Sequence, residues 1–164
     1  MTPEAVVDLL QLMIKFVSGD VLQTASRFIA QGVAIGTQEG MGTGLALKIS
    51  SKWPEVQKHF KQFTRSQNFQ GGDIFVVAPK KNRPGIIYVA TQPDVDHASL
   101  SFLNRGLRKL ARYCVKHQIE SVSLPMIGAG LGKLDWEEEV KPLLVKYLAD
   151  LETSFLIYED FKGE

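Results

Sequence analysis

Residues 121–136 read SVSLPMIGAGLGKLDW, a short apolar run that passes through a glycine-rich turn into a helix start. The run 121–127 predicts a buried strand, because it is short, apolar and bounded by glycine. Asp135 is expected to cap the helix that follows, and Glu138, three residues later, to complete a capping box. Strand-to-helix junctions of this kind form the ligand-binding edge of α/β sheets.

A second junction of the same kind comes earlier in the chain. The apolar run 28–35 is followed by GTQEGMGTG at 36–44 and by a helix predicted to end near Ser51. Glycines let the backbone approach a ligand closely, and the N–H groups of the following helix attract anions. A single glycine-rich loop more often serves only to let the chain turn than to bind a ligand, but two facing loops would hold a diphosphate. Neither the Walker phosphate loop nor the dinucleotide fingerprint is present, which disfavours the usual nucleotide hydrolases and NAD dehydrogenases.

The rest of the chain alternates strands and helices. We expect further strands at 13–17, 74–78, 86–90 and 154–158, and helices that open at Trp53-Pro54, at Ser99 and at Asp135. Pro142 is expected to kink or break the last of these helices. This order predicts an α/β layer fold with a largely parallel or mixed sheet, covered by helices on both faces.

Composition narrows the classes of protein further. The 164 residues are 45% hydrophobic and 23% charged, as in a single globular domain. The formal charge is +1, so any phosphate must be held locally rather than by an overall positive field. A lone cysteine, Cys114, excludes internal disulfides and multi-cysteine metal sites. The apolar run 6–17 is interrupted by charges and has no basic leader, which argues against a signal peptide or a membrane span. We therefore expect a cytoplasmic monomer with no membrane contact, no metal and no cofactor.

The helix from Ser99 onward has the clearest amphipathic pattern. Apolar residues recur at spacings of three and four, and the other faces carry Arg105, Arg108, Lys109, Arg112 and Lys116. Such a face is ordinarily the solvated side of a packed helix. The alternative is a module that binds nucleic acid through these side chains.

Three segments resemble the macrodomain family in chain order and spacing. They are 14–21 (IKFVSGDV), 40–46 (GMGTGLA) and 125–136 (PMIGAGLGKLDW), and the likeness runs from about Met13 to Tyr158. The last segment resembles the branch that contains the terminal ADP-ribose protein glycohydrolase and the DNA-ADP-ribosyl glycohydrolase antitoxin. The resemblance implies a three-layer α/β/α fold with a mixed, mostly parallel sheet of about six strands. It also implies a macrodomain over 13–164 and leaves 1–12 as an N-terminal extension with a short helix.

In that family ADP-ribose lies in a cleft at the edge of the sheet. The resemblance implies that Asp20 accepts a hydrogen bond from the adenine amino group, that two glycine loops hold the diphosphate, and that Tyr158 lies by the adenine ring. The implied ligand-binding residues are Asp20, Val21, Gly42, Thr43, Gly44, Leu45, Ile127, Gly128, Ala129, Gly130, Leu131, Gly132 and Tyr158. Read without a ligand, Asp20 closes a turn, Tyr158 is a core residue and Asp135 is a helix cap.

The resemblance breaks at the residues that would act on the distal ribose. Gln92 stands where the branch has a lysine, and glutamine cannot form the adduct that an amine forms. Gly132 stands where some relatives have an aspartate, and Gly36 where many have an asparagine. The run Asp94-Val95-Asp96-His97 could supply a general base or acid, although such a run before a helix is more often a cap. The catalytic residues are therefore left open.

The sequence thus predicts a protein that binds ADP-ribose, or ADP-ribosylated protein or nucleic acid. If it is an enzyme, we expect an ADP-ribosyl glycohydrolase or an ADP-ribose 1″-phosphate phosphatase-like hydrolase. Otherwise it is a non-catalytic reader or a sink for such nucleotides.

Overall fold

A computed structural model of the chain describes residues 14–35, 44–94, 97–129 and 132–159. The predicted N-terminal extension over 1–12 lies outside these residues, as do Gly36, Gly42, Thr43, Asp96, Gly130 and Leu131. The strands are β1 (Ile14–Val17), β2 (Phe28–Ala34), β3 (Ile74–Val77), β4 (Gly85–Gln92), β5 (Ser121–Leu124) and β6 (Ser154–Tyr158). They form one six-stranded sheet in the order β1-β6-β5-β2-β4-β3.

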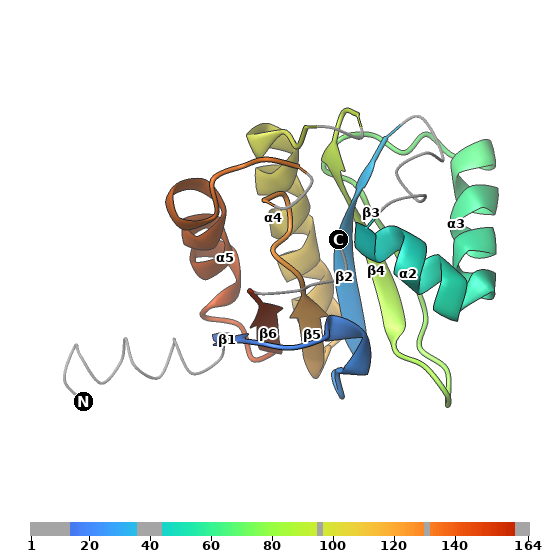
Figure 1. Ribbon diagram of the computed structural model, residues 1–164, viewed down its shortest axis with the longest axis horizontal. Coiled ribbons are helices and arrows are strands. Elements are labelled where there is room, and N and C mark those ends of the chain that lie inside the picture. Colours follow the sequence, from blue (N-terminus) through green and yellow to red (C-terminus); the bar gives the residue numbers. More distant parts are fainter. Residues whose placement is uncertain (1–13, 36–43, 95–96, 130–131, 160–164) are drawn as a thin grey trace.

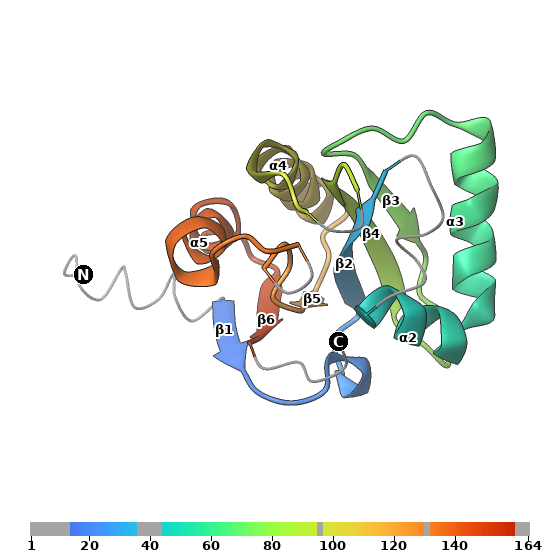
Figure 2. The ribbon, with the colours of Figure 1, turned by 45° about the horizontal axis from the view of Figure 1, so that its top comes forward.

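Helices cover both faces of this sheet (Figures 1 and 2). The helices α4 (Leu100–Lys116) and α5 (Lys141–Leu148) lie on one face, and α2 (Gly44–Lys52) and α3 (Pro54–Ser66) lie on the other. On the first face Leu103, Leu107, Leu110 and Cys114 of α4 are buried against the sheet, as the periodicity predicts, whereas Leu100 in the first turn stays exposed. On the second face the ring of Phe60 stacks on that of Tyr88, with centroids 4.3 Å apart. The predicted three-layer fold is confirmed.

The sheet is parallel except at β3, which pairs with β4 in the antiparallel sense. β2 pairs with β4 along its whole length, from Phe28↔Gly85 to Ala34↔Gln92. It pairs with β5 at only two positions, Phe28↔Val122 and Ile29↔Ser123. β5 ends at Leu124, three residues earlier than predicted, because Pro125 has no amide hydrogen to continue the ladder. β2 and β5 are therefore joined at their amino ends and have no ladder bonds at their carboxyl ends.

The helix after the second glycine loop begins with a π turn, Trp136–Val140, before α5. Asp135 caps this turn, since its carboxylate accepts from the Glu138 amide at 2.8 Å. The return bond of the capping box comes from Glu139, whose Oε1 accepts from the Asp135 amide at 3.0 Å, and not from Glu138 as predicted. The wider π turn brings the fourth residue, rather than the third, back over the cap. Pro142 lies at the start of α5, so the expected break falls between the two helical segments.

A buried guanidinium holds the turn between β3 and β4 in place. Arg83 donates to the carbonyls of Ala78 and Pro84 at 2.9 and 3.0 Å, and its Nε donates to Glu55 at the start of α3 at 2.9 Å. Among the described residues, no helix has both the length and the apolar character that crossing a bilayer would require.

Candidate ligand-binding site

The parallel strands direct the candidate residues to one edge of the sheet. β1, β6, β5, β2 and β4 all run in the same direction, so their carboxyl ends and the loops that follow them share that edge. The two glycine-rich segments follow β2 and β5, which are neighbours in the sheet, and Asp20 follows β1. The second loop therefore begins at the edge where β2 and β5 part, and most of the first glycine-rich segment, residues 36–43, lies outside the described residues.

Asp20 is exposed and already has a structural role. It caps the short 3-10 turn Val21–Gln23, where its Oδ1 accepts from the Leu22 amide at 2.9 Å. A carboxylate has further lone pairs after this bond, so capping and ligand recognition are compatible. Val21 is fully buried, and its contact with a ligand stays a prediction.

Three other predicted ligand residues belong to the core. Leu45 and Tyr158 are buried in the cluster under α2 and α3, and Ile127 is buried in the cluster under α4 and α5. The ring of Tyr158 packs beneath the turn at Gly19, 3.9 Å from the point that a Cβ there would occupy. Its proximity to an adenine ring stays a prediction.

The second glycine loop turns back on itself tightly. Gly128 has a φ of +79°, which favours glycine, and its carbonyl accepts from the Leu134 amide at 2.9 Å. A Cβ on Gly132 would lie 2.6 Å from the Gly128 oxygen and 2.8 Å from the Cβ of Ala98. The aspartate that some relatives have at this position therefore does not fit the loop as it is folded here.

The loop that follows β4 is hydrogen-bonded to the second glycine loop, a contact that the sequence did not predict. The Ala98 amide donates to the Gly132 carbonyl at 2.8 Å, and the Ser99 amide donates to the Thr91 carbonyl at 2.8 Å. Ser99 caps α4, with its hydroxyl accepting from the Phe102 amide. These bonds bring the residues after β4 beside the glycine loop that follows β5.

Gln92 and Asp94 shape the start of the same loop. The Gln92 side-chain amide donates to the Asp94 carbonyl at 2.9 Å, and the Asp94 carboxylate accepts from the His97 amide at 3.0 Å. The Nδ1 of His97 lies 3.5 Å from the same carboxylate oxygen. Gln92 therefore organises the loop at the position where the resemblance implies a lysine. The described residues include no group of three or more His, Cys, Asp or Glu side chains able to hold a metal ion.

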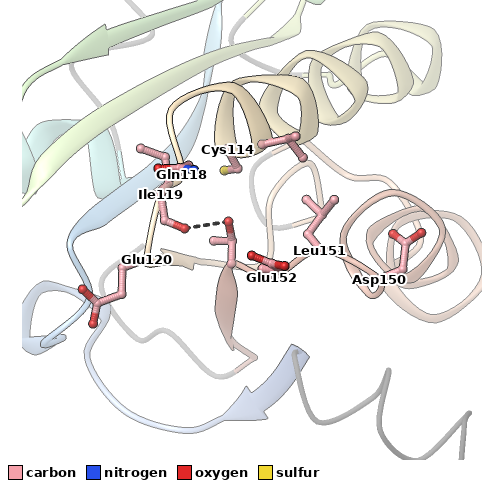
Figure 3. A pocket seen from close by; sticks show the side chains of 9 residues that line it. Cys114, Gln118, Ile119, Glu120, Asp150, Leu151 and Glu152 are labelled. Atoms are coloured by element: carbon pink, nitrogen blue, oxygen red, sulfur yellow. Dashed lines mark hydrogen bonds between the residues drawn. The ribbon is translucent and has the colours of Figure 1, made fainter.

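A pocket of about 640 Å³ lies at the opposite edge, before the amino ends of β5 and β6 (Figure 3). Its rim carries the exposed acids Glu120, Asp150 and Glu152, which disfavour an anionic ligand there. Thr153 closes its floor by donating to the Ile119 carbonyl at 2.7 Å. Cys114 also lines it, and burial raises the pKa of this thiol to about 11, which keeps it a poor nucleophile. This pocket is not suited to a diphosphate.

All the charged side chains on the outer face of α4 are basic. The helix contains no acidic residue, and its exposed charges are those of Arg105, Arg108, Lys109, Arg112 and Lys116. Lys109 pairs with Asp73, which lies just before β3. The remaining four recur every three or four residues and so form a single stripe along the helix.

Comparisons with known proteins agree with this arrangement. A family model described as Macro domain matches residues 34–142. The chain is 27% identical over 156 residues to a DNA ADP-ribosyl glycohydrolase of Mycobacterium tuberculosis, covering 92% of this chain and 43% of that protein. It is 30% identical over 98 residues to the human ADP-ribose glycohydrolase OARD1, covering 59% of this chain and 60% of that protein.

Among solved structures, the macrodomain of Thermus aquaticus DarG superposes with a TM-score of 0.80 at 27% identity. The match covers 90% of this chain and 98% of that one. The chain spans less than half the length of the mycobacterial relative, so the likeness to that protein concerns this one domain.

Proposed function

Because the chain belongs to the macrodomain family, we propose that it binds ADP-ribose at the carboxyl edge of its sheet and releases this group from an ADP-ribosylated macromolecule. The observation that carries the proposal is the position of the two glycine loops after β2 and β5, the neighbouring strands that part at this edge. Backbone amides in such loops bind a diphosphate without Lys or Arg side chains, which suits a chain with a formal charge of +1.

Asp20 supplies selectivity for the base in this proposal. It is exposed, stands at the same edge and keeps acceptor capacity after capping the turn at Val21. A carboxylate accepts from the amino group of adenine and disfavours bases that present an acceptor there. The glycohydrolase names of the relatives support the release step, which this chain would perform without the branch lysine.

Calorimetric titration with ADP-ribose tests the binding step. Asp20→Asn keeps an oxygen that can cap the Leu22 amide but replaces the other acceptor by a donor. Losing one charge-assisted hydrogen bond costs about 1.5–3 kcal/mol, which weakens binding roughly 10- to 150-fold. Glu120→Gln, an exposed carboxylate at the opposite edge, is the matched control and should bind as the wild type does. No heat and no thermal stabilisation with the wild-type protein would reject the proposal.

The basic stripe on α4 favours a second candidate function, the binding of nucleic acid. Four arginine or lysine side chains on one exposed face could contact successive phosphates. Affinity for an unmodified single-stranded oligonucleotide should then fall steeply with salt. Reversal of charge at Arg108 and Arg112 should reduce that slope, and Asp20→Asn should leave it unchanged.

A further inference from the structure

We propose that His97 is the general base of the hydrolysis and that Asp94 positions its ring. This inference rests on the proposed function and assigns a residue to its chemical step. The resemblance implies a lysine at position 92, where this chain has a glutamine whose amide is engaged with the Asp94 carbonyl. The structure offers a different group on the same loop.

The contacts of His97 place it beside the candidate binding site. It is followed directly by Ala98, whose amide donates to the carbonyl of Gly132 in the second glycine loop. The backbone of His97 is held by the Asp94 carboxylate at 3.0 Å, so the position of the residue does not depend on its own ring. The backbone at His97 and Ala98 is therefore held beside the loop proposed to bind the diphosphate, at the edge where the distal ribose would lie.

The ring also has the geometry of an oriented base. Its Nδ1 lies 3.5 Å from an Asp94 oxygen, which favours the tautomer with the proton on Nδ1. Nε2 points away from this carboxylate contact, and the side chain is 65% exposed, so water and substrate can reach it. Of the other two histidines, His59 lies on α3, on the face of the sheet opposite α4 (Figure 2), and His117 caps the carboxyl end of α4 with its ring tilted against that of Tyr113.

The step balances without a further reactant. Nε2 of His97 takes a proton from a water molecule while the water oxygen bonds to the anomeric carbon of the distal ribose. The bond from this carbon to the modified macromolecule breaks, and its electron pair leaves with the macromolecule. The leaving atom then receives the proton, so that the products are free ADP-ribose and the unmodified macromolecule.

The test uses the full chain and a single-stranded DNA oligonucleotide that carries ADP-ribose, with release of ADP-ribose as the readout. His97→Ala should lower kcat about 100- to 10,000-fold, and added imidazole should restore part of the rate. Asp94→Asn should give a smaller loss in kcat with little change in KM. His59→Ala is the matched control for an exposed histidine and should keep the wild-type rate.

Calorimetry with free ADP-ribose separates this inference from the proposed function. Binding by both the wild type and His97→Ala, together with the loss of turnover in the variant alone, is the expected result. Turnover that survives in His97→Ala would overturn the role of His97. Binding without release by the wild type would overturn it as well, while leaving ADP-ribose recognition intact. Absence of binding would instead reject the proposed function.

Discussion

Substitution of Gly132 by alanine probes the loop on which the candidate site depends. The new Cβ would lie 2.6 Å from the Gly128 carbonyl oxygen and 2.8 Å from the Cβ of Ala98. Both distances are roughly 1 Å shorter than ordinary contact, and one neighbour is backbone, so the loop itself must shift. Overpacking of this kind costs about 1–3 kcal/mol. In a domain of this size we expect the melting temperature to fall by about 2–12 °C.

Thermal unfolding of a mutant cycle measures this effect. Ala98→Gly removes one of the two collisions, so the double variant should recover part of the loss suffered by Gly132→Ala alone. It should not reach the stability of Ala98→Gly, because the contact with the Gly128 oxygen persists. The coupling between the two positions should be about 0.5–3 kcal/mol. A Gly132→Ala protein that melts within about 1 °C of the wild type, or effects that simply add, would refute the described packing of the loop.

Three further predictions concern side chains away from the glycine loops. Arg83→Met should lower the free energy of unfolding in urea by about 2–4 kcal/mol, because two carbonyls lose their donor. Glu55→Gln should cost less than about 1 kcal/mol, because Glu55 is partly exposed. A larger loss in Glu55→Gln than in Arg83→Met would contradict the role of the Arg83 bonds to the two carbonyls. Burial opposes ionisation of Asp73, but the bonds from the Lys109 side chain and the Gln70 amide, with the charges of Lys109 and Arg105, together outweigh it and lower the pKa of this carboxyl. Its stabilising contribution is therefore complete above about pH 4 and lost as the pH falls through the lowered pKa, so Asp73→Asn should flatten the decline in melting temperature below about pH 4. Cys114, with its pKa raised to about 11, should resist a thiol reagent at neutral pH until the protein is unfolded, and rapid labelling of the native protein would contradict its burial.

The fold was largely predictable because most of its helices and strands have a clear local sequence pattern. The apolar stripe of α4 and the short apolar runs of the strands need no tertiary information. The errors arose where backbone geometry decided the outcome. Pro125 ended β5 early, and the π turn gave the return capping bond to Glu139 instead of Glu138. Pro125 was a signal for the end of the ladder that the apolar run around it outweighed, whereas the width of a helical turn has no clear signature in residue type.

The candidate site was predictable only in outline. Asp20 and the second glycine loop were predicted from motif spacing, and the structure places them at one edge, while their contact with a ligand stays a prediction. The attachment of the loop after β4 through Ala98 and Gly132 was missed, since bonds between backbone groups can be made by almost any residue. Arg83 was missed because a guanidinium in a polar turn looks exposed until its partners are known.

The two-pair ladder between β2 and β5 has a mechanical consequence. The two halves of the sheet, β1-β6-β5 and β2-β4-β3, are hydrogen-bonded to each other only at the amino ends of β2 and β5. A nucleotide bound at the carboxyl ends of β2 and β5 would connect the two halves. Its binding would therefore raise the free energy of unfolding by about 2.7 kcal/mol at a concentration 100 times the Kd. Amide hydrogens in both halves of the sheet should then exchange more slowly in the presence of the nucleotide, including those far from any atom it touches.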